Sequence, residues 1–405
     1  MARREVMTAA QNANKNEFYT QYKDIEKEVN SYVEYDKDVF RDKIILLPCD
    51  DPEWSNFTKY FAANFERFGI KKLISTSYAR GWANNHQITL FELNSPEYDA
   101  SKHERHGKKF VLERDTDGSG HINQKDIEFE YLDGDGDFRS EEVTALRDEA
   151  DIIITNPPFN TLFREFFAWI MEAKKKFLCI ASINSITYKE VFPYIKNNEI
   201  WLGTGMGRWI SGFIVPSDYS THGSEAKILD NGQKIVATNS CLWLTNLDHC
   251  KRHEPLTLMT MADNLKYNKT LIKKLDKVYK SKEYQVYDNY DAIEVPVTEA
   301  IPSDYDGIMG VPITFLDKYN PDQFEIIGLG NSRDNFTPNK DYTNAKKILK
   351  NGKIVAGGAI NCVLAVKLNF TPVGEIYYTS DETEVLHAPY ARILIKHKKV
   401  GDENE

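Results

Sequence analysis

An apolar run that ends in Asn156-Pro157-Pro158-Phe159 is the segment of the sequence best suited to chemistry. The exocyclic amine of adenine is a poor nucleophile because its lone pair is delocalised into the ring. The Asn156 side-chain oxygen and the Pro157 carbonyl can each accept one N–H of such an amine, which aims the nitrogen lone pair at an electrophilic methyl group. The tetrapeptide therefore predicts methyl transfer to an amine.

The other two residues of the tetrapeptide suit the same reaction. Proline fixes the backbone of the loop and brings no N–H group that would compete for the acceptors. Phe159 offers an aromatic face on which an extruded base can stack, and Trp209 or Phe213 are candidates for the opposite wall. The structural alternative is a simple turn after a strand, because Asn-Pro commonly begins turns.

The elements that must position this tetrapeptide alternate between strand-like and helical patterns, which is typical of an α/β fold with a mainly parallel sheet. Strands are predicted at Lys43–Leu47, Lys71–Ser75, Asp151–Thr155, Lys176–Ala181, Ile200–Gly203 and Lys234–Leu247. Helices are predicted at Glu17–Tyr32, Ser55–Phe68, Leu162–Lys175 and Tyr188–Asn197. In such a sheet ligands bind at the carboxyl ends of the strands, and residues 156–159 follow one of those ends. Asn231-Gly232 indicates an antiparallel hairpin at the edge of the sheet.

The pattern changes near residue 250, which predicts a domain of residues 1–250 and a second, mixed α+β domain of residues 251–405. The second domain begins with a basic segment, in which residues 266–282 include seven lysines and one acidic residue. Five of these lysines recur at spacings of three and four, on one face of a predicted helix: Lys266, Lys269, Lys273, Lys277 and Lys280. Apolar residues repeat on another face, at Leu265, Ile272, Leu275 and Tyr279. The lysines are either contacts to DNA phosphates or a solvated face.

Composition restricts the class of protein. The chain has 405 residues and a formal net charge of -10, and residues 113–142 alone contain eleven acidic against three basic residues, a net of -8. No apolar run is long enough for a membrane span, so no membrane partner is expected. Five cysteines without a CxxC pair favour free thiols in a reducing cytoplasm. No obligatory protein partner is evident.

The acidic insertion at residues 113–142 contains a calcium-like loop. Oxygen donors occupy positions 1, 3, 5, 9 and 12 of an EF-hand pattern, at Asp115, Asp117, Ser119, Asn123 and Asp126. Position 12 is an aspartate instead of the longer glutamate, and residues 108–114 predict a strand instead of an entering helix. The alternative is a solvated acidic insertion without metal.

The chain as a whole resembles the EcoRI-type adenine-specific DNA methyltransferases, which use S-adenosylmethionine (AdoMet). Besides Asn-Pro-Pro-Phe, five segments carry the resemblance. They are Glu17–Gln21 (EFYTQ), Pro48–Pro52 (PCDDP), Gly134–Ser140 (GDGDFRS), Ala181–Lys196 (ASINSITYKEVFPYIK) and Gly310–Ile327 (GVPITFLDKYNPDQFEII). The resemblance implies a Rossmann-like AdoMet-binding domain that precedes a DNA target-recognition domain.

The resemblance also implies a cofactor site. Phe18, Tyr19 and Thr20 match the segment that contacts the methionine end of AdoMet. Asp50 and Asp51 match the loop that cradles its amino acid part. Asp137 would accept a hydrogen bond from the amino group of the cofactor's adenine. No Gly-x-Gly follows the first strand, which departs from the broad methyltransferase pattern.

The sequence therefore predicts a site-specific DNA adenine-N6 methyltransferase of the restriction–modification type, acting on a flipped base in double-stranded DNA. Two alternatives remain at this point. One is the same chemistry on an RNA base or a protein glutamine, and the other is a catalytically silent, calcium-regulated DNA-binding protein.

Overall fold

The structure is a computed structural model, and it describes residues 19–50, 55–79, 99, 101–102, 105–114, 122, 126, 128–157, 162–206, 210, 212–215, 226–229, 232–236, 240–381 and 384–398. The chain divides into two compact units. The first consists of Met1–Ser185 and Ile200–Cys250, and the second of Ile186–Glu199 and Lys251–Glu405. The division after Cys250 falls at the predicted position, but Ile186–Glu199 belongs to the second unit, which the sequence did not indicate.

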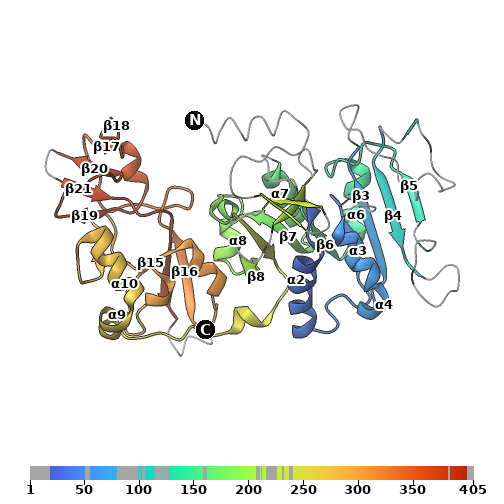
Figure 1. Ribbon diagram of the computed structural model, residues 1–405, viewed down its shortest axis with the longest axis horizontal. Helices are drawn as coiled ribbons and strands as arrows, with labels where there is room; N and C mark the ends of the chain where they lie inside the picture. The colour runs from blue at the N-terminus through green and yellow to red at the C-terminus, as the bar shows by residue number, and fades with distance from the viewer. Residues whose placement is uncertain are drawn as a thin grey trace. The chain divides into compact units, whose positions relative to one another are not determined.

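An eight-stranded sheet is the centre of the first unit (Figure 1). In spatial order its strands are β5 (Glu128–Tyr131), β4 (Lys108–Leu112), β3 (Lys72–Ser77), β2 (Ile44–Leu47), β6 (Ile152–Thr155), β7 (Lys176–Ser182), β12 (Cys241–Thr245) and β8 (Trp201–Met206). The four central strands β3, β2, β6 and β7 are parallel, and the two outer strands on each side run antiparallel to their neighbours. The predicted parallel sheet is therefore correct for the centre only, and the complete sheet is mixed.

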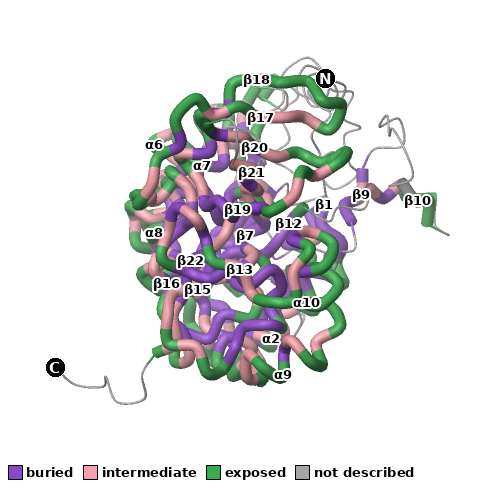
Figure 2. The backbone as a smooth tube through the Cα atoms, turned by 90° about the vertical axis from the view of Figure 1, so that its left-hand side faces the viewer, coloured by how far each residue is buried: buried purple, intermediate pink, exposed green. Residues whose placement is uncertain are grey.

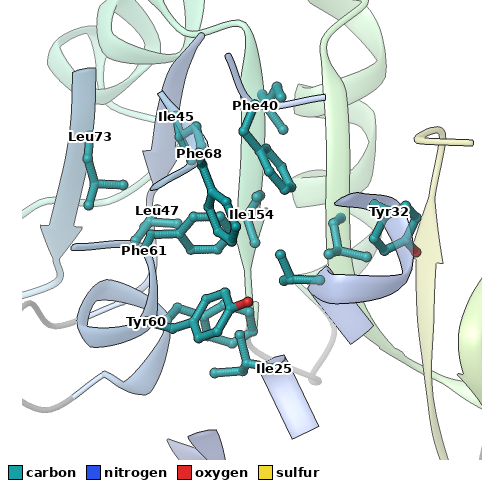
Figure 3. Packing of buried hydrophobic residues seen from close by; sticks show 14 of the residues in the cluster. Ile25, Tyr32, Phe40, Ile45, Leu47, Tyr60, Phe61, Phe68, Leu73 and Ile154 are labelled. Carbon is teal, nitrogen blue, oxygen red and sulfur yellow. The ribbon is translucent and has the colours of Figure 1, made fainter. Parts of the chain in front are cut away.

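Helices pack against this sheet through their apolar faces. They are α2 (Tyr22–Tyr35), α3 (Asn56–Ala63), α4 (Phe65–Phe68), α6 (Glu141–Glu149) and α7 (Phe163–Glu172). On α2 the buried residues Ile25, Val29 and Tyr32 recur at helical spacing and enter a core with residues of β2 and α3 (Figure 3). Burying such side chains is worth roughly 1.5–3 kcal/mol each, so these contacts fix α2 and α3 on the sheet.

A buried carboxylate joins α2 to the edge strand β8. Glu28 accepts hydrogen bonds from Thr204 N at 2.8 Å, from Gly205 N at 3.0 Å and from the Tyr32 hydroxyl at 2.8 Å. Burial raises the pKa of Glu28, and its hydrogen bonds partly oppose that shift. Because Glu28 pairs two backbone N–H groups of β8, it covers part of the edge of the sheet.

A smaller sheet in the first unit corrects two predictions. Its order is β1 (Tyr19–Thr20), β9 (Phe213–Val215), β11 (Lys234–Val236) and β10 (Ala226–Ile228). The predicted hairpin at Asn231-Gly232 is present as β10–β11, but it lies in this sheet and not at the edge of the large one. The single strand predicted for Lys234–Leu247 is wrong, because β11 and β12 belong to different sheets.

The described residues of the acidic segment 113–142 include a strand, β5, and the start of a helix, α6, which the sequence did not predict. The predicted strand before it is confirmed as β4, and β5 pairs antiparallel with β4. The helix α6 begins within the segment, where Ser140 caps it by accepting a hydrogen bond from Val143 N at 3.2 Å. Most of the described part of the segment therefore extends the large sheet and its helix layer.

The second unit contains two five-stranded sheets. The first has the order β13 (Gln285–Val286), β14 (Ile293–Glu294), β15 (Met309–Pro312), β22 (Arg392–His397), β16 (Phe324–Leu329). The second has the order β18 (Ile354–Ala356), β17 (Lys346–Ile348), β20 (Tyr377–Ser380), β21 (Glu384–His387), β19 (Val366–Leu368). The α-helices of the second unit are α8 (Phe192–Lys196), α9 (Met261–Tyr267) and α10 (Lys269–Lys274), and a π-helical turn (Leu275–Tyr279) follows α10. Among the described residues, no helix is long and apolar enough to cross a membrane.

A buried ion pair crosses the first sheet of the second unit. Glu294 is completely buried and accepts hydrogen bonds from Arg392 Nη2 at 2.6 Å and Arg392 Nε at 3.0 Å. The Tyr287 hydroxyl also donates to Glu294. Gly310 leaves room for that hydroxyl, since a Cβ at this position would lie 2.1 Å from it. The pair thus connects β14 to β22 in the interior.

Candidate active site

The candidate site lies where the chain changes direction across the large sheet. β2 is flanked by β3 on one side and by β6 on the other, and all three strands are parallel. Such a topological switch point is the usual ligand site of an open α/β sheet. Pro48, Cys49 and Asp50 follow β2, and Asn156 and Pro157 follow β6. The predicted catalytic residues and one predicted cofactor residue therefore leave adjacent strands at the same edge.

Asp50 is held in place by the helix that follows it. The Ser55 hydroxyl donates to Asp50 Oδ1 at 2.7 Å and accepts from Phe57 N at 3.1 Å, as the N-cap of α3. The Ser75 hydroxyl on β3 donates to the carbonyl of Asp50. Asp50 is 5% exposed, so a buried carboxylate stands at the beginning of α3. An anion at a helix N-terminus is favoured by the helix dipole.

Two buried hydroxyl groups lie at the ends of strands. Within the described residues Thr20 Oγ1, at the end of β1, has no hydrogen-bond partner, whereas Thr155 Oγ1, at the end of β6, interacts with the Cys49 thiol. The backbone of Thr20 is fixed, because its carbonyl accepts from Asn56 Nδ2 at 2.7 Å. Buried polar groups are nearly always paired, so an unpaired hydroxyl beside a candidate ligand site points to a partner that binds there.

Asp137 reaches the same edge through a tight glycine turn. Ala79 N, just after β3, donates to the Asp135 carbonyl at 2.6 Å. Gly136 has φ +81°, and a Cβ there would lie 2.2 Å from the Ser77 carbonyl oxygen. Only glycine allows this approach, which fixes the loop before Asp137 at the carboxyl end of β3.

An arginine orients the Asp137 carboxylate. Arg139 Nη2 donates to Asp137 Oδ2 at 2.6 Å, and Arg139 Nε donates to Oδ1 at 2.9 Å. These bonds lower the pKa of Asp137. Arg139 Nη1 also donates to Glu165 on α7 at 3.1 Å, so it connects the Asp137 loop to the helix that follows the catalytic tetrapeptide. A bidentate arginine holds a carboxylate in one orientation.

The Cys49 thiol, which follows β2, is a poor acid. Burial raises the pKa of this thiol, and the negative charges of Asp50 and Asp137 raise it further. The thiol therefore stays protonated and acts as a small apolar group.

The first two residues of the catalytic tetrapeptide continue directly from the buried strand β6. Ile152, Ile153 and Ile154 are each at most 2% exposed, so the polar sequence begins directly after a buried strand. Asn156 is half-buried with its Oδ1 atom buried, and Pro157 is buried. An amide oxygen at the bottom of a buried edge is suited to accept a hydrogen bond from a bound ligand.

The structure describes the side chains of five of the predicted site residues. They are Thr20, Asp50, Asp137, Asn156 and Pro157. Tyr19 forms β1 with Thr20, and nothing is described of its side chain. The predictions for Phe18, Asp51, Pro158 and Phe159 lie outside the described residues and stay predictions.

The calcium prediction is also untested. Asp126 is buried, and Asp115, Asp117, Ser119 and Asn123 lie outside the described residues. Within the described ranges, no group of three or more His, Cys, Asp or Glu side chains is arranged to hold a metal ion. Of the two candidates for the second aromatic wall, Phe213 is buried in the core of the first unit, and Trp209 lies outside the described residues.

Sequence reasoning missed the residues that hold the site in place. Ser55, Asn56 and Arg139 contact Asp50, Thr20 and Asp137 as described above. Ser55 carried a recognisable signal, since serine before a helical pattern predicts an N-cap. Arg139 is two residues after Asp137 in the segment Gly134–Ser140, and this spacing could have predicted a contact between the arginine and the carboxylate.

The lysine helix is broken and does not form one face. Lys266 is on α9, and Lys269 and Lys273 are on α10, which begins after Asn268. Asn268 caps α10 by accepting from Leu271 N at 3.1 Å. Lys277 lies in the π-helical turn and Lys280 ends it. All five lysines are exposed.

The apolar face of this segment also differs from the prediction. Leu271, Leu275 and Tyr279 are buried, whereas Ile272 is 40% exposed. The π-helical turn changes the spacing of the face, and the break at Asn268 separates it from Leu265. The segment nevertheless docks on one side and presents its lysines to solvent.

Comparisons with known proteins identify the family of the chain. A sequence model of the family described as "Adenine-specific methyltransferase EcoRI" matches residues 6–398. The chain is 45% identical to the type II methyltransferase M.EcoRI of Escherichia coli over 328 residues, which cover 80% of this chain and 89% of that protein. It is 32% identical to M.MgeORF184P of Mycoplasma genitalium over 78% of this chain and 84% of that protein. It is 30% identical to M.MpnI of Mycoplasma pneumoniae over 78% of this chain and 83% of that protein. No solved structure gives a significant match. The chain therefore belongs to the family of EcoRI-type adenine-specific methyltransferases.

Proposed function

We propose that this adenine-specific methyltransferase transfers a methyl group from AdoMet to N6 of an adenine in double-stranded DNA, as part of a restriction–modification system. The observation that carries the proposal is the position of Asn156 and Pro157 at the switch point of the large sheet, directly after β6, which pairs with the strand that precedes Asp50. Membership of the family supports adenine as the target. The three relatives are named type II methyltransferases, which supports the restriction–modification setting.

The residues at the switch point fit AdoMet by their chemistry. AdoMet carries an ammonium group, ribose hydroxyls and an adenine amine, which all donate hydrogen bonds. Asp50 and Asp137 offer fixed carboxylate acceptors, and the buried hydroxyl of Thr20 can accept or donate. Phe18, Tyr19 and Asp51 are proposed to complete the site. When bound, AdoMet supplies a methyl group on a positively charged sulfur, which leaves as a neutral thioether.

The chain's own task is to activate the amine. Asn156 Oδ1 and the Pro157 carbonyl would each accept one N–H of the adenine amine, which withdraws the lone pair from the ring and aims it at the methyl group. Because Asn156 Oδ1 and Pro157 are buried, these bonds are made away from water, where they are stronger. Pro158 and Phe159 are proposed to shape the loop and to stack on the base. An adenine inside a duplex cannot reach this edge, so the base must be flipped out.

The alternatives are less well supported. A protein glutamine or a single RNA base needs no large second unit to read a duplex, whereas residues 251–405 form two additional sheets. A silent DNA-binding protein would have no reason to keep Asn156 and two oriented carboxylates at the switch point. We place the enzyme in the cytoplasm, where its free cysteines stay reduced.

The first test is cofactor binding by metal-depleted protein. Calorimetric titration with AdoMet after EDTA treatment should give one site, since none of the proposed ligands requires a metal. Asp137→Ala should weaken AdoMet binding about 10-fold or more, because a hydrogen bond to a charged group contributes roughly 1.5–3 kcal/mol. Glu165→Gln, which removes only the outer partner of Arg139, should leave the dissociation constant within about 2-fold. Equal effects of the two substitutions would argue against Asp137 as a cofactor ligand.

The second test concerns the exposed lysines of the second unit, which we propose contact DNA phosphates. Replacing Lys266, Lys269, Lys273, Lys277 and Lys280 by glutamine should weaken cognate and random duplexes equally, because phosphates carry no sequence information. The slope of log K against log[salt] should decrease by roughly 0.9 for each lost contact. Fluorescence anisotropy at several salt concentrations measures both quantities. An unchanged slope would mean that these lysines are only solvated.

A further inference from the structure

The chain contains the same β-hairpin twice, once in each unit. In the first unit β10 and β11 pair Ile228 with Lys234, and in the second unit β17 and β18 pair Ile348 with Ile354. Residues 228–232 read Ile-Leu-Asp-Asn-Gly and residues 348–352 read Ile-Leu-Lys-Asn-Gly, at a constant offset of 120 positions. Figure 1 shows β17 and β18 at one end of their sheet, where β18 is the outermost strand.

The described hydrogen bonds at the two turns match. In the first hairpin Leu229 N donates to the Gln233 carbonyl and Gly232 N to the Leu229 carbonyl, both at 2.8 Å. In the second, Leu349 N donates to the Lys353 carbonyl at 2.9 Å and Gly352 N to the Leu349 carbonyl at 2.8 Å. Gly232 has φ +80° and Gly352 has φ +79°. The residues that the structure describes on both sides of the two turns therefore have the same hydrogen bonds and the same glycine conformation.

The two hairpins differ in charge. The positions of Lys350 and Lys353 correspond in sequence to Asp230 and Gln233. Residues 345–357 contain four lysines and no acidic residue, whereas the corresponding residues 225–237 contain two lysines and two acidic residues. The excess of positive charge is therefore particular to the β17–β18 hairpin and is not part of the shared pattern.

Nor does the β17–β18 hairpin contribute to the core of the second unit. The core beside it consists of Tyr342, Ile360, Ala365, Tyr378 and Leu386. None of the six residues of the two strands is buried, and the strand β18 is largely exposed (Figure 2). A Cβ at Gly352 would meet nothing within 4 Å, so the tip of the hairpin extends into open space.

The two faces of the hairpin differ. Lys347 lies on the inner face, with its Nζ over the Tyr378 ring at 5.6 Å. Strand alternation puts Lys346, Ile348 and Ile354 on the outer face, where Ile354 is 61% exposed. At the tip, Lys350 pairs with Glu375 at 3.3 Å, but both side chains are about two-thirds exposed and such a pair is weak. The outer face and tip therefore combine three available lysines with an apolar side chain.

From these observations we propose that the β17–β18 hairpin is a DNA-binding arm that enters a groove of the duplex. A two-stranded ribbon fits the major groove of B-form DNA, its lysines can contact phosphates on both sides, and an apolar residue can contact a thymine methyl group. The partner is double-stranded DNA, because the charge complements phosphates and the ribbon matches a groove. The inference rests on the proposed function and adds a contact surface to it.

The neighbouring lysines on opposite faces supply a matched test. The triple variant combines Lys346→Gln, Lys350→Gln and Lys353→Gln. Its slope of log K against log[salt] for a cognate duplex should fall by roughly 2.7, at 0.9 per phosphate contact. Lys347→Gln, in the same strand but on the inner face, should leave the slope unchanged. AdoMet affinity and melting temperature should be those of the parent for both proteins. Anisotropy with labelled duplex and calorimetry with AdoMet provide these readings.

Each outcome is decisive for one of the two proposals. If the parent methylates and binds duplex DNA but the triple variant keeps its salt slope, the hairpin is not a DNA arm. Self-association of the triple variant at an unchanged slope would mean that the lysines only guard the exposed edge of β18. If the parent neither binds nor methylates a duplex while it binds AdoMet, the proposed substrate is wrong, and with it the arm.

Discussion

Asn156→Ala is expected to reduce the rate of methyl transfer about 100-fold or more, with AdoMet binding within about 2-fold of the parent. The substitution removes one of the two acceptors that would activate the adenine amine, and loss of one preorganised hydrogen-bonding group typically costs about 10²–10³-fold in rate. Single-turnover methylation of a cognate duplex measures the chemical step directly. Calorimetry measures the cofactor affinity of the same preparation.

Asn156→Asp is the conservative control for this prediction. Aspartate keeps an oxygen at the position of Asn156 Oδ1, so it can still accept from the amine, and it should keep more activity than alanine. The buried Oδ1 atom and the buried neighbour Pro157 make the position sensitive to any change in shape. Parent-like single-turnover rates in Asn156→Ala would remove the residue from the catalytic assignment.

The second large effect is expected in stability, from Glu294→Ala. This change leaves Arg392, whose side chain is only 12% exposed, without its carboxylate partner. It also removes the acceptor of the Tyr287 hydroxyl. Breaking a buried pair by removing one partner typically costs about 3–5 kcal/mol, because an unpaired charge is left in the interior. Urea unfolding, followed by a probe in the second unit, should show this decrease in the free energy of unfolding.

Glu299→Ala is the matched control in the same unit. Glu299 pairs with Lys318 at 2.8 Å, but the side chains are 63% and 45% exposed, so the loss should be no more than about 1 kcal/mol. A comparable loss in both variants would show that water reaches the Glu294–Arg392 pair and that its burial has no energetic consequence.

Much of the first unit could be predicted from sequence because its strands are apolar runs with polar ends. The run Ile152–Thr155 became a central strand within one residue of its prediction, since three consecutive isoleucines have to be buried on both faces of a sheet. Topology then puts Asn156 and Asp50 after neighbouring parallel strands, whose carboxyl ends lie at one edge of the sheet.

Three features of the fold could not be predicted from the sequence. The break at Asn268 depends on a side chain that caps a new helix, although the lysine spacing around it continues a helical pattern. Helix α6 was missed because Val143 is its only buried residue, so its sequence has almost no apolar periodicity. The strands β11 and β12 belong to different sheets because of tertiary packing, and neither strand's own sequence indicates this.

The segment Ile186–Glu199 has a consequence for how the protein is made. It belongs to the second unit although it is synthesised within the first, and Phe192 and Ile195 are buried there. Its partners come much later in the chain, since Thr187 accepts from Arg333 Nη1 at 2.7 Å and Asn198 accepts from Arg252 Nη2 at 2.5 Å. During synthesis these apolar side chains stay exposed to solvent until residues well beyond 250 have left the ribosome. In a chain truncated at Cys250 these apolar side chains would stay exposed permanently. A separately folding first unit therefore requires a short linker in place of residues 186–199.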